Sequence, residues 1–133
     1  MDADSKAKLS QINAQLAGLF TQFSQNVLND EQRVTVLQDE RQLAGLPESV
    51  VDAMSAAAKQ YAVDKKLSAE DSPQWVVNNT RSSMEPVLTY ADDRSLREQV
   101  WKTYYSRGDN GDDNDTNEII TAILKLRAER AKL

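Results

Sequence analysis

Residues 79–111 read NTRSSMEPVLTYADDRSLREQVWKTYYSRGDNG, and this stretch decides how the second half of the chain folds. Ser82 precedes Glu85 by three residues, which is the spacing of a capping box at a helix start. Pro86 then falls in or just after the first turn, where its missing N–H costs least. The stretch therefore predicts a short helix from about Ser82 to Ala91.

A second helix start follows directly. The pair Asp92-Asp93 breaks the first helix and favours a new one, because carboxylates are stabilised at the positive end of a helix. Ser95 with Glu98 offers an alternative capping box. Gly108 and Gly111, set among Asp and Asn, end this helix with turn residues. One face of the helix is expected to carry Leu96, Val100 and Tyr104.

The N-terminal part of the chain predicts one long amphipathic helix from about Ser5 to Asp30. Apolar residues recur there at steps of three and four: Leu9, Ile12, Leu16, Leu19, Phe20, Phe23 and Val27. Such a stripe suits either an ordinary bundle helix or a helix that binds a partner protein. The stripe is wider than a coiled-coil seam, which favours the bundle helix.

The middle of the chain predicts shorter elements. Val34–Leu37 alternates apolar residues and is interpreted as a brief extended piece or a loop. Asp39 can cap a short helix that ends at Gly45. Pro47 suits the first position of the next helix, which runs to about Lys66.

The segment 74–78, with Trp75 and two valines, is the best strand candidate. A lone strand needs a partner edge. The last helix is expected to start near Asp115, with Glu118 at capping-box spacing, and to be still helical at Leu133. The sequence thus predicts a mainly α fold, bundle-like, with about five helices and one short strand, in which residues 1–133 form a single helical region.

Several motifs of this chain occur in a fixed order in one family of enzymes. They are Phe23–Leu28 (FSQNVL), Leu43–Pro47 (LAGLP), Trp75, Ser83–Ala91 (SMEPVLTYA), Arg94–Glu98 (RSLRE), the aromatic run Trp101–Tyr105, Arg107-Gly108, Asn114-Asp115, Ile119-Ile120, Ile123–Arg127 (ILKLR) and Ala131–Leu133 (AKL). The ordered set resembles the M3 zinc metallopeptidases, which include oligopeptidase A, thimet oligopeptidase and peptidyl-dipeptidase. Arg81 and Ser82 depart from the family pattern, which more often has an apolar residue and a proline there.

The resemblance implies a parent enzyme that cleaves short peptides in an enclosed channel with a zinc-bound water. The family's chemistry uses a His-Glu-x-x-His helix and a further glutamate, whereas this chain contains no histidine. The chain therefore resembles the segment before the catalytic domain. We expect a fragment that supplies scaffold and channel wall, with the rest of the peptidase as its partner and peptides as the parent's substrates. The strand at 74–78 would lie near the channel, and its partner strand would be missing from the fragment.

Composition excludes several classes of function. The net charge is −5 and no Lys/Arg cluster exists, which argues against nucleic acid and anionic membranes as partners. No apolar run approaches the length of a membrane span, and the first residues, MDADSKAK, are not a signal peptide. The absence of cysteine excludes disulfides and thiolate sites. The resemblance implies a cytoplasmic or periplasmic enzyme of the bacterial type.

No catalytic, cofactor-binding or metal-binding residue is predicted in this chain. The acidic loop Asp109–Asp115 fails the calcium-loop pattern and is interpreted as a turn. Arg94 and Arg97 could bind a peptide carboxylate, but ion pairs within or between helices are the simpler interpretation. Four glutamates are assigned to helix starts or exposed faces: Glu40, Glu48, Glu85 and Glu98. The alternative function is a stand-alone helical adaptor that binds a partner through its apolar stripe.

Overall fold

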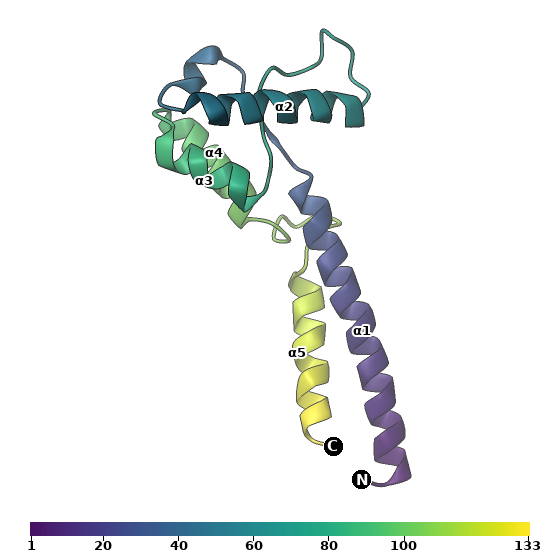
Figure 1. The fold of residues 1–133 in the computed structure, drawn as a ribbon. Helices are drawn as coiled ribbons and strands as arrows, with labels where there is room; N and C mark the ends of the chain where they lie inside the picture. Colours follow the sequence, from purple (N-terminus) through teal and green to yellow (C-terminus); the bar gives the residue numbers. More distant parts are fainter. The chain divides into compact units, whose positions relative to one another are not determined.

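The computed structural model describes all residues from 1 to 133 and contains five α-helices, one 3₁₀ helix and one two-stranded sheet (Figure 1). The chain is 65% helical, which confirms the mainly α prediction. The elements in order are α1 (Ala3–Glu31), β1 (Thr35–Val36), η1 (Glu40–Leu43), α2 (Glu48–Asp64), β2 (Val76–Val77), α3 (Arg81–Tyr90), α4 (Arg94–Tyr105) and α5 (Asn117–Ala131). No helix combines the length and apolar character that crossing a bilayer requires.

The elements group into two compact units. One unit consists of Met1–Asp30 and Gly108–Leu133, and the other is the continuous segment Glu31–Arg107. The first unit is therefore closed by residues far apart in sequence, whereas the second is one uninterrupted stretch.

The first unit is an antiparallel hairpin of α1 and α5, with both chain ends at the same end of the hairpin (Figure 1). The apolar stripe predicted for α1 packs against α5. Its buried centre is formed by Ile12, Leu16, Ile119 and Ile123, flanked by Leu19, Phe23, Leu126 and Leu133. The centre of the stripe is thus already covered, which weighs against the adaptor interpretation.

The predicted ends of α5 were wrong by about two residues. The helix begins at Asn117, and Thr116 is its N-cap without a side-chain cap bond, so the capping box with Glu118 is not formed. The carboxylate of Asp115 instead accepts the backbone N–H groups of Gly111 (2.9 Å) and Asn117 (2.8 Å), which fixes it in the turn before the helix. The helix ends at Ala131 rather than Leu133.

The second unit has the larger core. Eight buried side chains from the sheet and from α2, α3, α4 and their connections make one cluster: Leu37, Met54, Val77, Met84, Val87, Ala91, Leu96 and Val100. Leu96 and Val87 are fully buried at 0% exposure. The face predicted for α4 is therefore the core face, as its spacing indicated.

The strand at 74–78 is confirmed as β2, but the expectation that its partner is missing was wrong. β1 pairs with β2 in antiparallel register, with Val36 opposite Val76. The N–H of Leu37 extends the pair by donating to the carbonyl of Trp75 at 3.1 Å. The short apolar alternation at 34–37 therefore supplies the edge that the lone strand needed.

The start of α3 differs from the prediction. Thr80, not Ser82, is the N-cap of α3, and Glu85 pairs with Arg81 at 2.7 Å instead of closing a capping box. Because the N-cap of α3 lies two residues earlier than predicted, Pro86 lies inside the helix. The proline removes one donor of the helix and leaves the carbonyl four residues before it without its usual bond.

The other helix starts in this unit follow their caps closely. Asp93 caps α4 by accepting the N–H of Leu96 at 3.0 Å, so the alternative cap at Ser95 is not used. Asp39 forms a capping box with Gln42, but the helix is a 3₁₀ turn that ends at Leu43. Pro47 is the N-cap of α2 rather than its first helical residue.

Gly45 is the glycine that this unit needs most. Its φ is +86°, and a Cβ there would collide with the carbonyl oxygen of Tyr90 and the carboxylate of Asp92. The N–H of Asp92 donates to the carbonyl of Ala44 at 2.9 Å, which holds this loop against the α3–α4 corner. A side chain at position 45 would break that close backbone approach.

Candidate functional site

One concave surface of the second unit is a groove along α2, made of two adjoining clefts. The first cleft, of about 390 Å³, lies between α2, β2 and the start of α3. The second, of about 480 Å³, lies between the later half of α2 and residues 31–34. Both are lined by Ala57 and Asn78, so they form one continuous groove.

The two ends of this groove differ in polarity. The first cleft is mostly apolar, lined by side chains such as Val50, Met54 and Pro86. The second carries charged groups of both signs, including Glu31 and Lys65. A groove of this kind can hold an apolar side chain at one end and polar or charged groups at the other.

Both residues of β2, Val76 and Val77, line the first cleft but are almost fully buried, at 1% and 2% exposure. Hydrogen-bonded positions alternate along an antiparallel pair. The bond from Leu37 N–H to Trp75 carbonyl marks Trp75 as facing β1. The peptide groups of Val76 therefore point away from β1, on the edge of β2 that has no paired strand.

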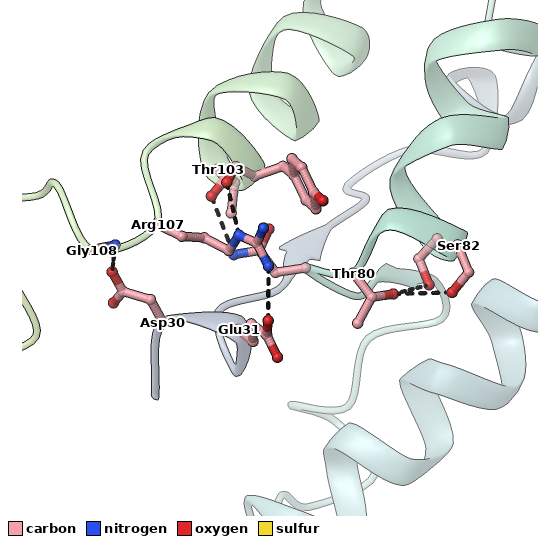
Figure 2. A network of polar contacts seen from close by, with 10 residues as sticks. Asp30, Glu31, Thr80, Ser82, Thr103, Arg107 and Gly108 are labelled. Atoms are coloured by element: carbon pink, nitrogen blue, oxygen red, sulfur yellow. Dashed lines mark hydrogen bonds and ion pairs between the residues drawn. The ribbon is translucent and has the colours of Figure 1, made fainter. Parts of the chain in front are cut away.

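The hydroxyl groups in the first cleft are not arranged for nucleophilic catalysis. The Oγ atoms of Ser82 and Ser83 lie 3.3 and 3.1 Å from Oγ1 of Thr80 (Figure 2). An activated serine needs a general base within hydrogen-bond reach, and no histidine exists to provide one.

An ion pair joins the first and the last residue of the second unit. The guanidinium of Arg107 donates to Glu31 at 2.8 Å and lies 4.1 Å from the ring centroid of Tyr104 (Figure 2). Its Nε also donates to the carbonyl of Tyr104 at 3.1 Å. The side chains of Arg107 and Glu31 are 23% and 35% exposed, so the pair is partly shielded from water. These contacts give Arg107 a structural role.

The two arginines considered for carboxylate binding lie elsewhere. Arg97 donates to the carbonyls of Ala91 (2.5 Å) and Asp92 (3.0 Å), so it fastens the α3–α4 turn. This contact is neither the peptide site nor the ion pair that the sequence suggested. Arg94 is exposed on α4, one turn before Glu98.

The glutamates considered for acid–base chemistry all occupy simple structural positions. Glu40 and Glu48 are the first residues of η1 and α2, and Glu85 pairs with Arg81. The hydrogen bond and charge of Lys102, 2.8 Å away, lower the pKa of Glu98, and the charge of Arg94 contributes further. No pair of these carboxylates shares a site.

The acidic loop uses its carboxylates as acceptors for nearby donors. Asp112 accepts the N–H of Asn114 at 3.0 Å, and Asp109 accepts the side-chain amide of Asn117 at 2.8 Å. The backbone donors of Asn117 and Gly111 lower the pKa of Asp115. Nowhere in the structure do three or more potential metal-ligating side chains cluster.

The sequence of the chain is similar to part of several peptidases. The chain is 34% identical over 134 aligned positions to "Organellar oligopeptidase A, chloroplastic/mitochondrial" from Arabidopsis thaliana, which covers 100% of this chain and 17% of that protein. It is 33% identical to "Oligopeptidase A" and 31% identical to "Dipeptidyl carboxypeptidase" from Escherichia coli strain K12, over 98% and 96% of this chain and 18% of each relative. The chain is homologous to one segment of the M3 peptidases. No protein-family profile matches it.

The chain spans less than a fifth of the length of the relatives it matches. The residues present do not fit the zinc that the family uses, because the chain has no histidine or cysteine and no cluster of carboxylates. The groove along α2 was not predicted from the sequence. Two small residues of α2, Ala53 and Ala57, line it, and small side chains leave room beside a helix.

Proposed function

We propose that residues 1–133 are a non-catalytic part of an M3-type zinc peptidase that hydrolyses short peptides as an oligopeptidase or peptidyl-dipeptidase. One observation carries the proposal: the whole segment aligns with relatives named as peptidases, yet covers only 17–18% of each. Residues elsewhere in such a parent chain would supply the zinc ligands and the glutamate base. The segment would serve as a single helical region of scaffold and channel wall, in the cytoplasm or periplasm.

The groove along α2 is the surface we assign to the channel wall. Val76 is only 1% exposed, so a peptide would contact the apolar side chains of the first cleft rather than the backbone of β2. Apolar contacts of this kind hold a peptide without requiring one specific sequence. This arrangement would suit a channel that accepts many short, unfolded peptides and excludes folded ones.

The first test is chemical. The purified 133-residue chain, supplied with zinc and a fluorogenic peptide, should hydrolyse nothing and bind no stoichiometric zinc. Peptide hydrolysis that survives repeated purification, or one tightly bound zinc per chain, would contradict a non-catalytic role.

The second test addresses the groove. Titration of the isotopically labelled chain with a short unstructured peptide should move the amide NMR signals of Val76 and Asn78. Ala57→Trp should abolish these shifts, because Ala57 lines both clefts. The matched control is Ala56→Trp, an exposed neighbour on α2 that lies outside both clefts. Shifts that Ala57→Trp leaves intact would assign the wall to another surface.

A further inference from the structure

The loop between α4 and α5 contains the dipeptide Asn110-Gly111, and no other asparagine of this chain precedes a glycine. In such a dipeptide the backbone nitrogen of the second residue can attack the side-chain amide carbon of asparagine. Any side chain on the second residue crowds this attack, and glycine has none. The sequence thus places the most reactive arrangement for asparagine deamidation in a single loop.

The folded loop keeps this arrangement accessible. Asn110 is exposed, and Gly111 has a φ of +64° with nothing within 4 Å of the position of a Cβ. The N–H of Gly111, which is the attacking group, donates to a carboxylate oxygen of Asp115 at 2.9 Å. A proton acceptor therefore already lies beside the nucleophile.

We propose that Asn110 is a site of spontaneous deamidation through a succinimide. The nitrogen of Gly111 forms a bond to Cγ of Asn110, and its proton passes to Asp115 or to solvent base. The bond between Cγ and Nδ2 breaks, and the leaving nitrogen takes up a proton and departs as ammonia. Water then opens the ring at either carbonyl, which gives aspartate or isoaspartate with no change in oxidation state.

This modification would alter the hydrogen bonds between the end of α1 and the loop that precedes α5. The side-chain amide of Asn110 donates to Asp30 at 3.2 Å. The same oxygen of Asp30 accepts the N–H of Gly108 at 2.6 Å (Figure 2). Asp30 is 0% exposed. A carboxylate at position 110 cannot donate and would repel Asp30. Deamidation should therefore loosen the loop that connects to α5.

Peptide mapping by mass spectrometry tests the chemistry on the folded chain incubated at neutral and mildly alkaline pH. Position 110 should exchange an NH₂ group for OH before any other asparagine does, with both aspartate and isoaspartate formed, and faster at higher pH. Asn110→Gln should abolish the change, because its amide would need a larger ring, whereas Asn114→Gln should leave it unaltered. A folded chain that stays intact while the urea-unfolded chain converts, or a product free of isoaspartate, would overturn the proposal.

A second pair of variants tests the consequence. Asn110→Asp should lower the Tm more than Asn114→Asp, which adds the same charge to the same loop. Asn114→Asp is the control because its carboxylate can still accept the side-chain amide of Asn29, which donates to Oδ1 of Asn114 at 3.2 Å. Equal Tm values for the two variants would show that Asp30 does not sense the modification. Neither test depends on the peptidase assignment.

Discussion

Eight buried apolar side chains form the core of the unit 31–107, whereas the α1–α5 hairpin buries four. The larger core draws on three helices and a small sheet, so each buried side chain has neighbours on several sides. In the hairpin, each helix offers one stripe to the other, and hydrogen bonds in the 108–116 loop complete the contact. The α1–α5 hairpin should therefore open at a lower free energy than the unit 31–107.

The largest effect is expected from Leu96→Ala in the larger core. Leu96 is 0% exposed, and removing such a side chain costs about 2–5 kcal/mol of unfolding free energy because a cavity remains. Urea denaturation followed by circular dichroism measures this. Leu124→Ala is the control: Leu124 is 59% exposed, and the change should stay within about 0.5 kcal/mol. Equal losses would refute the assignment of the core.

Leu16→Ala would break the hairpin instead. Leu16 is 2% exposed, but the two-helix contact can relax around a smaller residue, so we expect a loss near the lower limit, about 2 kcal/mol. Native-state hydrogen exchange should show faster exchange in α1 and α5 and unchanged exchange in α3 and α4. Uniform acceleration throughout the chain would mean that the two units unfold as one.

Two glycines separate a steric requirement from a conformational one. Gly45→Ala should cost about 1–3 kcal/mol, because the Cβ meets Tyr90 and Asp92 in addition to the positive φ. Gly111→Ala, with open space around it, should cost only about 1 kcal/mol for the left-handed conformation. Thermal melts of both variants give the order, and a reversed order would contradict the packing at Gly45.

The N-cap of α4 should contribute less to stability than the buried side chains of the core. Asp93→Ala removes the acceptor for the N–H of Leu96 and should cost about 1 kcal/mol. Ser95→Ala, at the alternative cap that the structure does not use, should change stability by less than about 0.5 kcal/mol. If the serine variant were the more damaging one, α4 would begin later than the structure places it.

The smallest effect is a pH dependence in the hairpin loop. The pKa of Asp115 is lowered from 3.8 by the N–H groups of Asn117 and Gly111. A lowered folded-state pKa means that the contribution is present above pH 3.8 and is lost as pH falls through the folded value. Carboxyl NMR titration should find the pKa of Asp115 below 3.8. A pKa at or above 3.8 would show that the two N–H bonds do not form in solution.

The fold was predicted best where a local pattern determines it. The apolar period of α1 and the face of α4 follow from spacing alone, and both are core faces in the structure. The N-caps Thr80 and Thr116 were missed because neither side chain accepts a capping hydrogen bond from its helix. The pairing of β1 with β2 joins residues about forty positions apart, which no local pattern encodes.

The groove could not be predicted for the same reason. It exists because α2, β2 and the start of α3 are brought together by the buried residues beneath them. Arg107 and Glu31 lie 76 positions apart, and the motif Arg107-Gly108 does not indicate Glu31 as its partner. The absence of histidine, by contrast, was decisive at the level of sequence, since it removes the family's zinc ligands from these residues.

Determination of the coding sequence beyond Leu133 tests the peptidase proposal most directly. We predict an uninterrupted frame of several times the present length that encodes His-Glu-x-x-His and a downstream glutamate. A long frame without that motif, or a stop codon directly after Leu133, would contradict the assignment to an M3-type zinc peptidase.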